Sequence, residues 1–125
     1  MSGISDSNLV ITKVKDCLIV TVRDDLSGVV LEEMQRKVLK DIQEKSCLKI
    51  IFELSALKFM DTIEFESLKK IAEMTSILGA ESIFVGIKAG IVNHLIMNDA
   101  ETSGLNAELD LNEALEKLGI IDVAS

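Results

Sequence analysis

The residues with the clearest chemical potential form one short segment in the middle of the chain, with the sequence Lys-Phe-Met-Asp-Thr-Ile-Glu-Phe. An aspartate just before an apolar helical pattern is a preferred N-cap, because its carboxylate accepts a hydrogen bond from a first-turn N–H group. If Asp61 is that cap, Glu64 falls at the third helical position and completes a capping box. Met60 and Phe65 then occupy the two positions of a hydrophobic staple. We therefore predict that a helix begins at Thr62.

Thr62 carries the side chain of this segment that a kinase could modify. At the first helical position its hydroxyl is expected to face solvent. A phosphate there would add about −1.5 to −2 charges near neutral pH. The helix N-terminus favours that charge, whereas the carboxylates of Asp61, Glu64 and Glu66 oppose it. The expected effect is a large change in surface potential with little refolding. The alternative interpretation is an ordinary capped helix, which explains the same residues without phosphorylation.

Sequence motifs for other chemistry are missing. His94 is the single histidine, and its neighbours supply no partner for a catalytic or metal-binding role. Neither GxGxxG nor GxxxxGK[ST] occurs, and Ser27-Gly28 does not build a phosphate-binding loop. Cys17 and Cys47 each begin an apolar run without CxxC spacing, which indicates buried thiols. We therefore expect no catalysis, no metal and no cofactor.

The composition limits the class of partner. A chain of 125 residues with 48% hydrophobic residues suits one domain with a packed core. The net charge of −8 repels nucleic-acid phosphates and anionic membranes, and the only aromatic residues are four phenylalanines. The first eight residues lack the basic and apolar regions typical of a signal peptide, and no apolar run approaches the roughly 20 residues that span a bilayer. We expect a cytoplasmic protein that binds neither nucleic acid nor membrane, with 1–8 as a short polar lead and 9–125 as a single domain.

Strand and helix patterns alternate along the chain. Two β-branched runs, 9–14 and 17–22, are separated by Lys15-Asp16 alone, which predicts a tight hairpin. Apolar residues then recur every three or four positions, first at Leu31, Met34, Val38 and Ile42. The expected order after the hairpin is helix 29–45, strand 48–53, helix 62–78 stopped by Gly79, strand 82–87, helix 89–98, a short strand 106–109 and helix 111–118. This alternation predicts an α/β fold with a mixed, mostly parallel sheet, an N-terminal antiparallel hairpin and about four helices.

Several segments resemble the STAS domain family, named for sulfate transporters and anti-sigma-factor antagonists. The strand 50–54 followed by Leu57-Lys58-Phe59-Met60-Asp61-Thr62 is similar to the family's phosphorylation loop, in which an Asp-Ser or Asp-Thr step begins a helix. Segments 74–80 and 85–88 resemble the family's next helix, glycine and strand, and 109–115 resembles its last strand and helix. The resemblance covers nearly the whole chain and implies a STAS-like fold.

Within the family, the chain most resembles the stressosome scaffold proteins, in particular the minimal, RsbS-like type. Ile63-Glu64 follows the Asp-Thr step where simple antagonists usually have a small residue and glycine. Gly86-Ile87-Lys88 before a helix also resembles the scaffold pattern. Two residues depart from that pattern, because Thr62 stands where the minimal scaffold usually has serine and Ala89 where a proline is often found.

The resemblance implies a scaffold that sequesters a serine/threonine kinase in a homo- or hetero-oligomer with STAS-containing sensor paralogues. Thr62 is implied as the phosphate acceptor, and its modification would release the kinase to start a stress response. Asp61 would orient the loop. Lys58, Phe59 and Glu64 would help to form the partner-binding surface.

The sequence leaves three alternatives open. A receiver domain needs an aspartate at the end of its central strand to accept phosphate beside Mg²⁺, and this sequence has Glu53 there. A stand-alone anti-sigma-factor antagonist that binds an anti-sigma kinase is the alternative within the family. A piece of an anion transporter is the third, because such transporters carry STAS domains.

Overall fold

The computed structural model describes residues 8–102, 107–108 and 110–121. Along the chain, its elements are β1 (Leu9–Val14), β2 (Cys17–Val22), α1 (Gly28–Lys45), β3 (Lys49–Glu53), α2 (Thr62–Ile77), β4 (Glu81–Val85), α3 (Ala89–Met97), β5 (Ala107–Glu108) and α4 (Leu111–Lys117). The strands lie in the order β1-β2-β3-β4-β5, with β1 antiparallel to β2 and every other pair parallel. The predicted α/β fold with a leading antiparallel hairpin is confirmed.

The strand order also decides against the receiver alternative. A doubly wound receiver-type sheet has the order 2-1-3-4-5 and places its first strand inside the sheet. Among the strands that the structure describes, β1 stands at the edge of the sheet and pairs only with β2. The receiver interpretation is therefore wrong.

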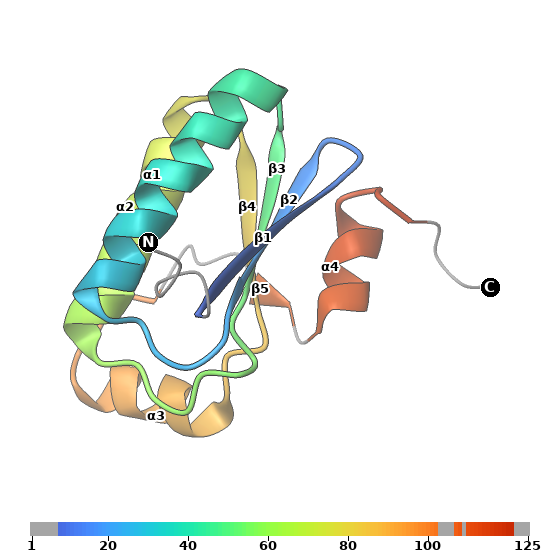
Figure 1. The fold of residues 1–125 in the computed structure, drawn as a ribbon. Coiled ribbons are helices and arrows are strands. Elements are labelled where there is room, and N and C mark those ends of the chain that lie inside the picture. Colours follow the sequence, from blue (N-terminus) through green and yellow to red (C-terminus); the bar gives the residue numbers. More distant parts are fainter. Residues whose placement is uncertain (1–7, 103–106, 109, 122–125) are drawn as a thin grey trace.

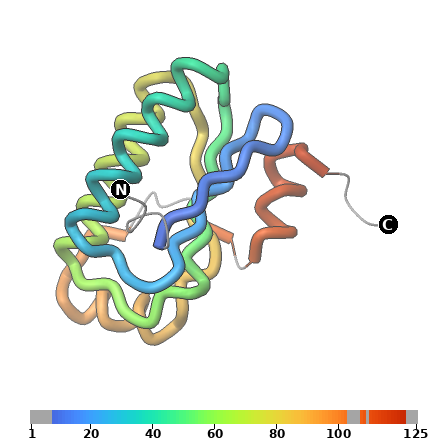
Figure 2. Tube along the Cα trace, in the orientation of Figure 1, coloured from blue at the N-terminus to red at the C-terminus, as the bar shows by residue number. Residues whose placement is uncertain are grey.

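Helices cover both faces of the sheet. Helices α1 and α2 lie side by side on one face, α4 lies on the other, and α3 crosses one end of the strands (Figures 1 and 2). Because side chains alternate along a strand, neighbouring residues of β3 enter different cores. Phe52 packs in the larger core under α1 and α2, with its ring centroid 5.2 Å from that of Phe84. Ile51 packs in the smaller core under α4.

Helix α1 begins one residue earlier than the pattern predicts. Ser27 is its N-cap, and the Ser27 hydroxyl accepts a hydrogen bond from the Val30 N–H group at 3.3 Å. Val30 is buried and Leu31 is only partly buried, so the apolar face starts one position before the one predicted. Met34, Val38 and Ile42 are buried as predicted.

The largest boundary error is at β4. Residues 82–87 were expected to be extended, but the strand spans Glu81–Val85. Gly86 has φ +78°, a left-handed conformation that ends the extended backbone. Gly79 stops α2 as predicted, with φ +90°, and the helix itself ends at Ile77.

Two predicted segments extend beyond the described residues. Of the predicted polar lead, 1–7 lie outside them. Of the predicted strand 106–109, residues 106 and 109 lie outside, and 107–108 form β5. Within the described residues, no helix combines the length and hydrophobicity needed to cross a membrane.

Candidate functional site

The start of α2 is held by a reciprocal capping box. Asp61 Oδ1 accepts a hydrogen bond from the Glu64 N–H group at 2.7 Å. In return, Glu64 Oε1 accepts one from the Asp61 N–H group at 3.0 Å. Met60 and Phe65 flank the box and are both buried in the larger core. The cap and the helix start that the sequence predicts are confirmed, and the backbone around Thr62 is fixed from both sides.

Thr62 is the first residue of α2 and is partly exposed. Its neighbour Ile63 is 75% exposed, so the side of this turn opposite the buried Phe65 faces solvent. Thr75, near the other end of α2, provides the contrast. Its side chain is 0% exposed, and its hydroxyl donates to the Ala72 carbonyl at 2.7 Å. Of these two threonines of α2, only Thr62 is partly exposed to solvent.

The loop between β3 and α2 has an inner and an outer side. Leu54, Leu57 and Met60 recur every three residues and are buried. Between the last two, Lys58 and Phe59 are exposed, with Phe59 52% exposed. The loop is thus pinned to the core at three points and presents Lys58 and Phe59 beside the capping box.

Local hydrogen bonds shape the first part of this loop. Glu53 Oε1 accepts hydrogen bonds from the Ser55 N–H group at 2.7 Å and from the Ser55 hydroxyl at 2.6 Å. The Leu57 N–H group donates to the Leu54 carbonyl at 3.0 Å, which closes a turn. The Glu53 carboxylate therefore serves as a structural acceptor within this loop.

Strand β4 and the residues that follow it form hydrogen bonds with this loop. The Leu54 N–H group donates to the Val85 carbonyl at 2.8 Å. The Lys88 ammonium donates to the Ser55 carbonyl at 2.7 Å and to the Leu57 carbonyl at 2.8 Å. Between them, Gly86 lies so close that a Cβ there would be 2.7 Å from Ser55 Cβ. The segment after β4 therefore packs directly on the loop that precedes Thr62.

Helix α3 makes a further contact with this loop. The rings of Phe59 and His94 meet edge to face, with centroids 4.9 Å apart. His94 is partly buried, and Asn98 Nδ2 lies 3.4 Å from its Nδ1. The histidine thus packs beside the loop and supports the exposed phenylalanine.

The family model for the STAS domain matches residues 8–118, most of the chain. The chain belongs to the STAS domain family. The comparison with curated protein sequences gives no match.

Several solved structures share this fold. A variant of RsbS from Moorella thermoacetica superimposes with a TM-score of 0.76 and 23% identity, over 89% of this chain and 94% of that one. A chain from the structure described as the molecular architecture of the stressosome gives a TM-score of 0.73 and 22% identity, over 88% and 96%. The anti-sigma-factor antagonist SpoIIAA in its unphosphorylated form gives 0.69 and 15%, over 90% and 99%.

In this STAS domain, the five residues predicted for the site lie close together in the sequence around the start of α2, and all are exposed or partly exposed. They are Lys58, Phe59, Asp61, Thr62 and Glu64. The sequence did not indicate the residues that hold this segment in place. These are Glu53, Ser55, Gly86, Lys88 and His94. Lys88 is 31 and 33 positions from the carbonyl groups it binds, so no local pattern connects them.

The two thiols of the STAS domain lie away from the surface. Cys17 and Cys47 are both free and buried, as predicted. Burial raises the pKa of the Cys17 thiol to about 11, and the nearby Asp16 carboxylate acts in the same direction. Burial also raises the pKa of Cys47. At both positions, burial thus favours the neutral thiol over the nucleophilic thiolate. Within the described residues, no three His, Cys, Asp or Glu side chains are grouped as a metal site requires.

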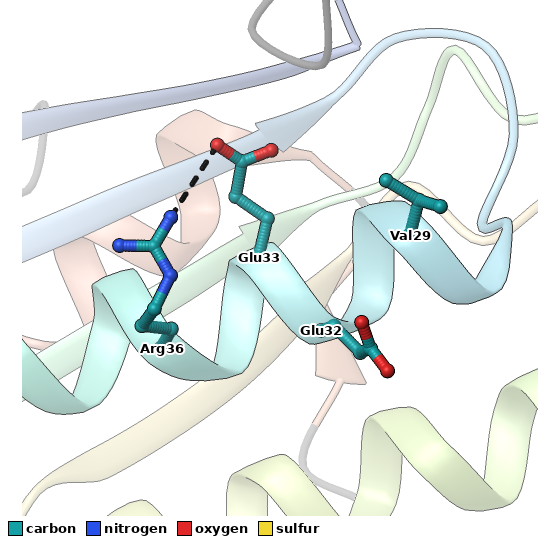
Figure 3. Close-up of a pocket in the computed structure, with 4 residues that line it drawn as sticks. All are labelled: Val29, Glu32, Glu33 and Arg36. Carbon is teal, nitrogen blue, oxygen red and sulfur yellow. Dashed lines mark ion pairs between the residues drawn. The ribbon is translucent and has the colours of Figure 1, made fainter. Parts of the chain in front are cut away.

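A hollow of about 340 Å³ lies beside α1 (Figure 3). Its described lining consists of Val29, Glu32, Glu33 and Arg36. The Glu33 carboxylate lies 3.7 Å from the Arg36 guanidinium, as the dashed line in Figure 3 shows. The same Glu33 carboxylate lies 3.1 Å from the Lys37 ammonium, so it forms ion pairs with two cationic side chains. None of the lining residues belongs to the segment around Thr62.

Proposed function

We propose that this STAS domain is a non-catalytic regulatory scaffold, which binds and sequesters a serine/threonine kinase in a stressosome-type complex and is switched by phosphorylation of Thr62. The geometry at the start of α2 carries the proposal. Thr62 is partly exposed there, while the capping box and the buried anchors of the preceding loop fix the surrounding backbone. A kinase would therefore meet the acceptor in one defined arrangement.

The proposed switch is a change of charge. The Thr62 hydroxyl oxygen takes the γ-phosphoryl group of ATP, the bond to ADP breaks, and the hydroxyl proton passes to a base on the kinase. The product carries about −1.5 to −2 charges at the helix N-terminus, which favours anions. Asp61 and Glu64 stand within the same turn and oppose the new charge. Since the cap is already satisfied, the phosphate would alter the potential of the docking surface more than its shape.

The proposed docking surface comprises Lys58, Phe59, Asp61, Thr62 and Glu64. Phe59 presents an exposed apolar ring that packs against the His94 ring, and Lys58 adds a positive charge. Such a mixture of an aromatic anchor and surrounding charges is common in protein interfaces. A phosphate at Thr62 would add like charge to the acidic part of this surface and so expel a partner that is acidic there.

The proposed assembly contains further copies of the chain or STAS-containing sensor paralogues, in the cytoplasm. The likeness in fold to a chain of the stressosome supports this. Large apolar side chains on the described surface would suit contacts with several partners. Those at least half exposed are Val29, Leu48, Phe59, Ile63, Ile77, Ile96 and Met97.

The test is to incubate the protein with ATP and the small serine/threonine kinase of the same organism, and to map phosphate by mass spectrometry. We expect one phosphate on Thr62, none in the Thr62→Val variant, and none on the buried Thr75 of the wild type. Thr62→Ser should still accept phosphate. Phosphate elsewhere with Thr62 unmodified would remove the proposed switch.

A binding measurement tests the second half of the proposal. Thr62→Glu places a permanent negative charge at the acceptor position and should weaken kinase binding by at least about ten-fold, because like charges across an interface are costly. Thr62→Ser is the matched control and should bind as the wild type does. Equal affinity of all three proteins would show that charge at this position does not control binding.

A stand-alone anti-sigma-factor antagonist is the second candidate. The likeness in fold to SpoIIAA, which has been solved in unphosphorylated and phosphorylated forms, favours it. Assembly size separates the two candidates. Native mass spectrometry should show a very large complex, alone or with sensor paralogues, for the scaffold, and a small species for the antagonist.

A further inference from the structure

The loop that precedes Thr62 is held by a residue of the next βα unit, at the junction between β4 and α3. Lys88 follows β4 and stands at the N-cap position of α3, where its side chain makes no capping hydrogen bond. Instead, its ammonium group reaches back to the loop and donates to the carbonyls of Ser55 and Leu57. One side chain thus bridges two backbone groups of the turn between Leu54 and Leu57.

The backbone before Lys88 makes this reach possible. Gly86 adopts φ +78° and lies against Ser55 so closely that a Cβ would meet both its Cβ and its backbone, at 2.7 to 3.0 Å. The Leu54 N–H group is bonded to Val85 in the same place. The chain therefore passes directly over the start of the loop before Lys88 turns its side chain onto it.

The Lys88 contact is a separate restraint from the buried anchors of the loop. Leu54, Leu57 and Met60 fix the loop by burying their side chains, whereas Lys88 binds the backbone carbonyls of Ser55 and Leu57. Ammonium-to-carbonyl hydrogen bonds are charge-assisted, and both of these are short. Lys88 also makes no ion pair within the described residues, so no carboxylate competes with the two carbonyls for its charge.

We propose that Lys88 is a positioning residue for Thr62: by holding the carbonyls of Ser55 and Leu57, it fixes the loop that carries the acceptor and so sets how efficiently a kinase phosphorylates it. The inference rests on the proposed function for its consequence, but the restraint itself is measurable without a kinase. Lys88 acts through the loop and makes no hydrogen bond to Thr62.

The first measurement is hydrogen exchange of the full-length protein. In Lys88→Met the stem remains and the donors are lost, so the amides of Ser55 and Leu57 should exchange about five- to ten-fold faster. Lys88→Arg retains donors and should restore slow exchange. Lys70→Met, an equal loss of charge on the exposed face of α2, is the control and should leave the loop unchanged. Unchanged protection of Val38 in α1 would show that each variant is folded.

The second measurement is the steady-state phosphorylation of Thr62 in the same proteins. A loosened loop spends less time in the arrangement that the kinase binds, so KM should rise in Lys88→Met while kcat changes little. We expect kcat/KM to fall at least about three-fold, with recovery in Lys88→Arg and no change in Lys70→Met.

The outcomes separate this inference from the proposed function. If loop exchange in Lys88→Met equals that of the wild type, Lys88 does not restrain the loop and the inference fails. It also fails if the loop loosens but kcat/KM stays unchanged, because Lys88 would then not position the acceptor. If wild-type Thr62 accepts no phosphate at all, the proposed function fails, whatever the exchange data show.

Discussion

Replacing Gly86 with alanine tests its close contact with Ser55 in the loop between β3 and α2, which precedes Thr62 and is called the Thr62 loop below. Gly86 has φ +78°, and an added Cβ would meet Ser55 Cβ at 2.7 Å and its Cα and N atoms at 3.0 Å. These are backbone-linked atoms, which cannot move aside as the end of a flexible side chain does. Gly79 is the matched control, because its φ is +90° and a Cβ there meets nothing within 4 Å.

The expected magnitudes follow from this difference. Both substitutions carry the left-handed strain of a residue with a Cβ, about 1–2 kcal/mol. Gly86→Ala adds an overpacking cost of about 1–3 kcal/mol, so its total is about 3 kcal/mol. The change in the unfolded chain is the same for both variants and cancels in the comparison. An unfolding entropy of about 0.26 kcal/mol/K for a chain of this length gives a Tm decrease of about 11 °C for Gly86→Ala and about 6 °C for Gly79→Ala.

The assay is urea unfolding followed by circular dichroism, with Tm from calorimetry on the same samples. Hydrogen exchange at Ser55 and Leu57 adds a local readout, which should accelerate in Gly86→Ala and stay unchanged in Gly79→Ala. If the two variants lose equal stability, the contact with Ser55 contributes nothing and the reasoning about the loop is refuted.

Three further predictions concern the cap, a thiol and the small helix. Asp61→Ala should lower the free energy of unfolding by about 1 kcal/mol and Asp61→Asn by only a few tenths, because Asn keeps the acceptor; equal losses in urea unfolding would exclude the capping role. The pKa of Cys17 is raised from 9.0 to about 11, so the folded state favours the neutral thiol. The contribution of the neutral Cys17 thiol to the free energy of unfolding is complete below about pH 9. It is lost as the pH rises through 11, by up to about 3 kcal/mol. Urea unfolding between pH 8 and 11 should therefore show a shallower decline in Cys17→Ala, and parallel curves would contradict this. Finally, Lys49→Met removes a 2.7 Å hydrogen bond to the Leu118 carbonyl at the end of α4. Exchange of the α4 amides should accelerate about five-fold while α1 stays protected, and unchanged α4 exchange would show that Lys49 does not anchor the helix.

The structure gives the proposed switch a physical basis in rigidity. The capping box fixes Thr62 from within α2, whereas Glu53, Gly86 and Lys88 fix the preceding loop. A phosphate on Thr62 would therefore change the charge of this surface while the backbone beneath it keeps its position. A partner would then be released by electrostatic repulsion, with no folding transition in this chain.

The sequence by itself determined the parts of the protein that depend on neighbours along the chain. Asp61 and Glu64 are three residues apart, so their capping box could be predicted from propensity alone. The order of strands and helices also followed from periodicity. A strand buries one face when alternate residues are apolar, and a helix does so when apolar residues recur every three or four positions. The stop of α2 at Gly79 followed from its left-handed preference.

Only the tertiary structure decided how the Thr62 loop is held. The bonds from Lys88 to Ser55 and Leu57, and the ring contact between Phe59 and His94, join residues more than thirty positions apart. Gly86 looked like part of a strand because its neighbours are apolar, and its true role depends on the Ser55 backbone that packs against it. Such contacts arise when the parallel strands β3 and β4 bring their ends to the same edge of the sheet, and no local pattern in the chain encodes that meeting.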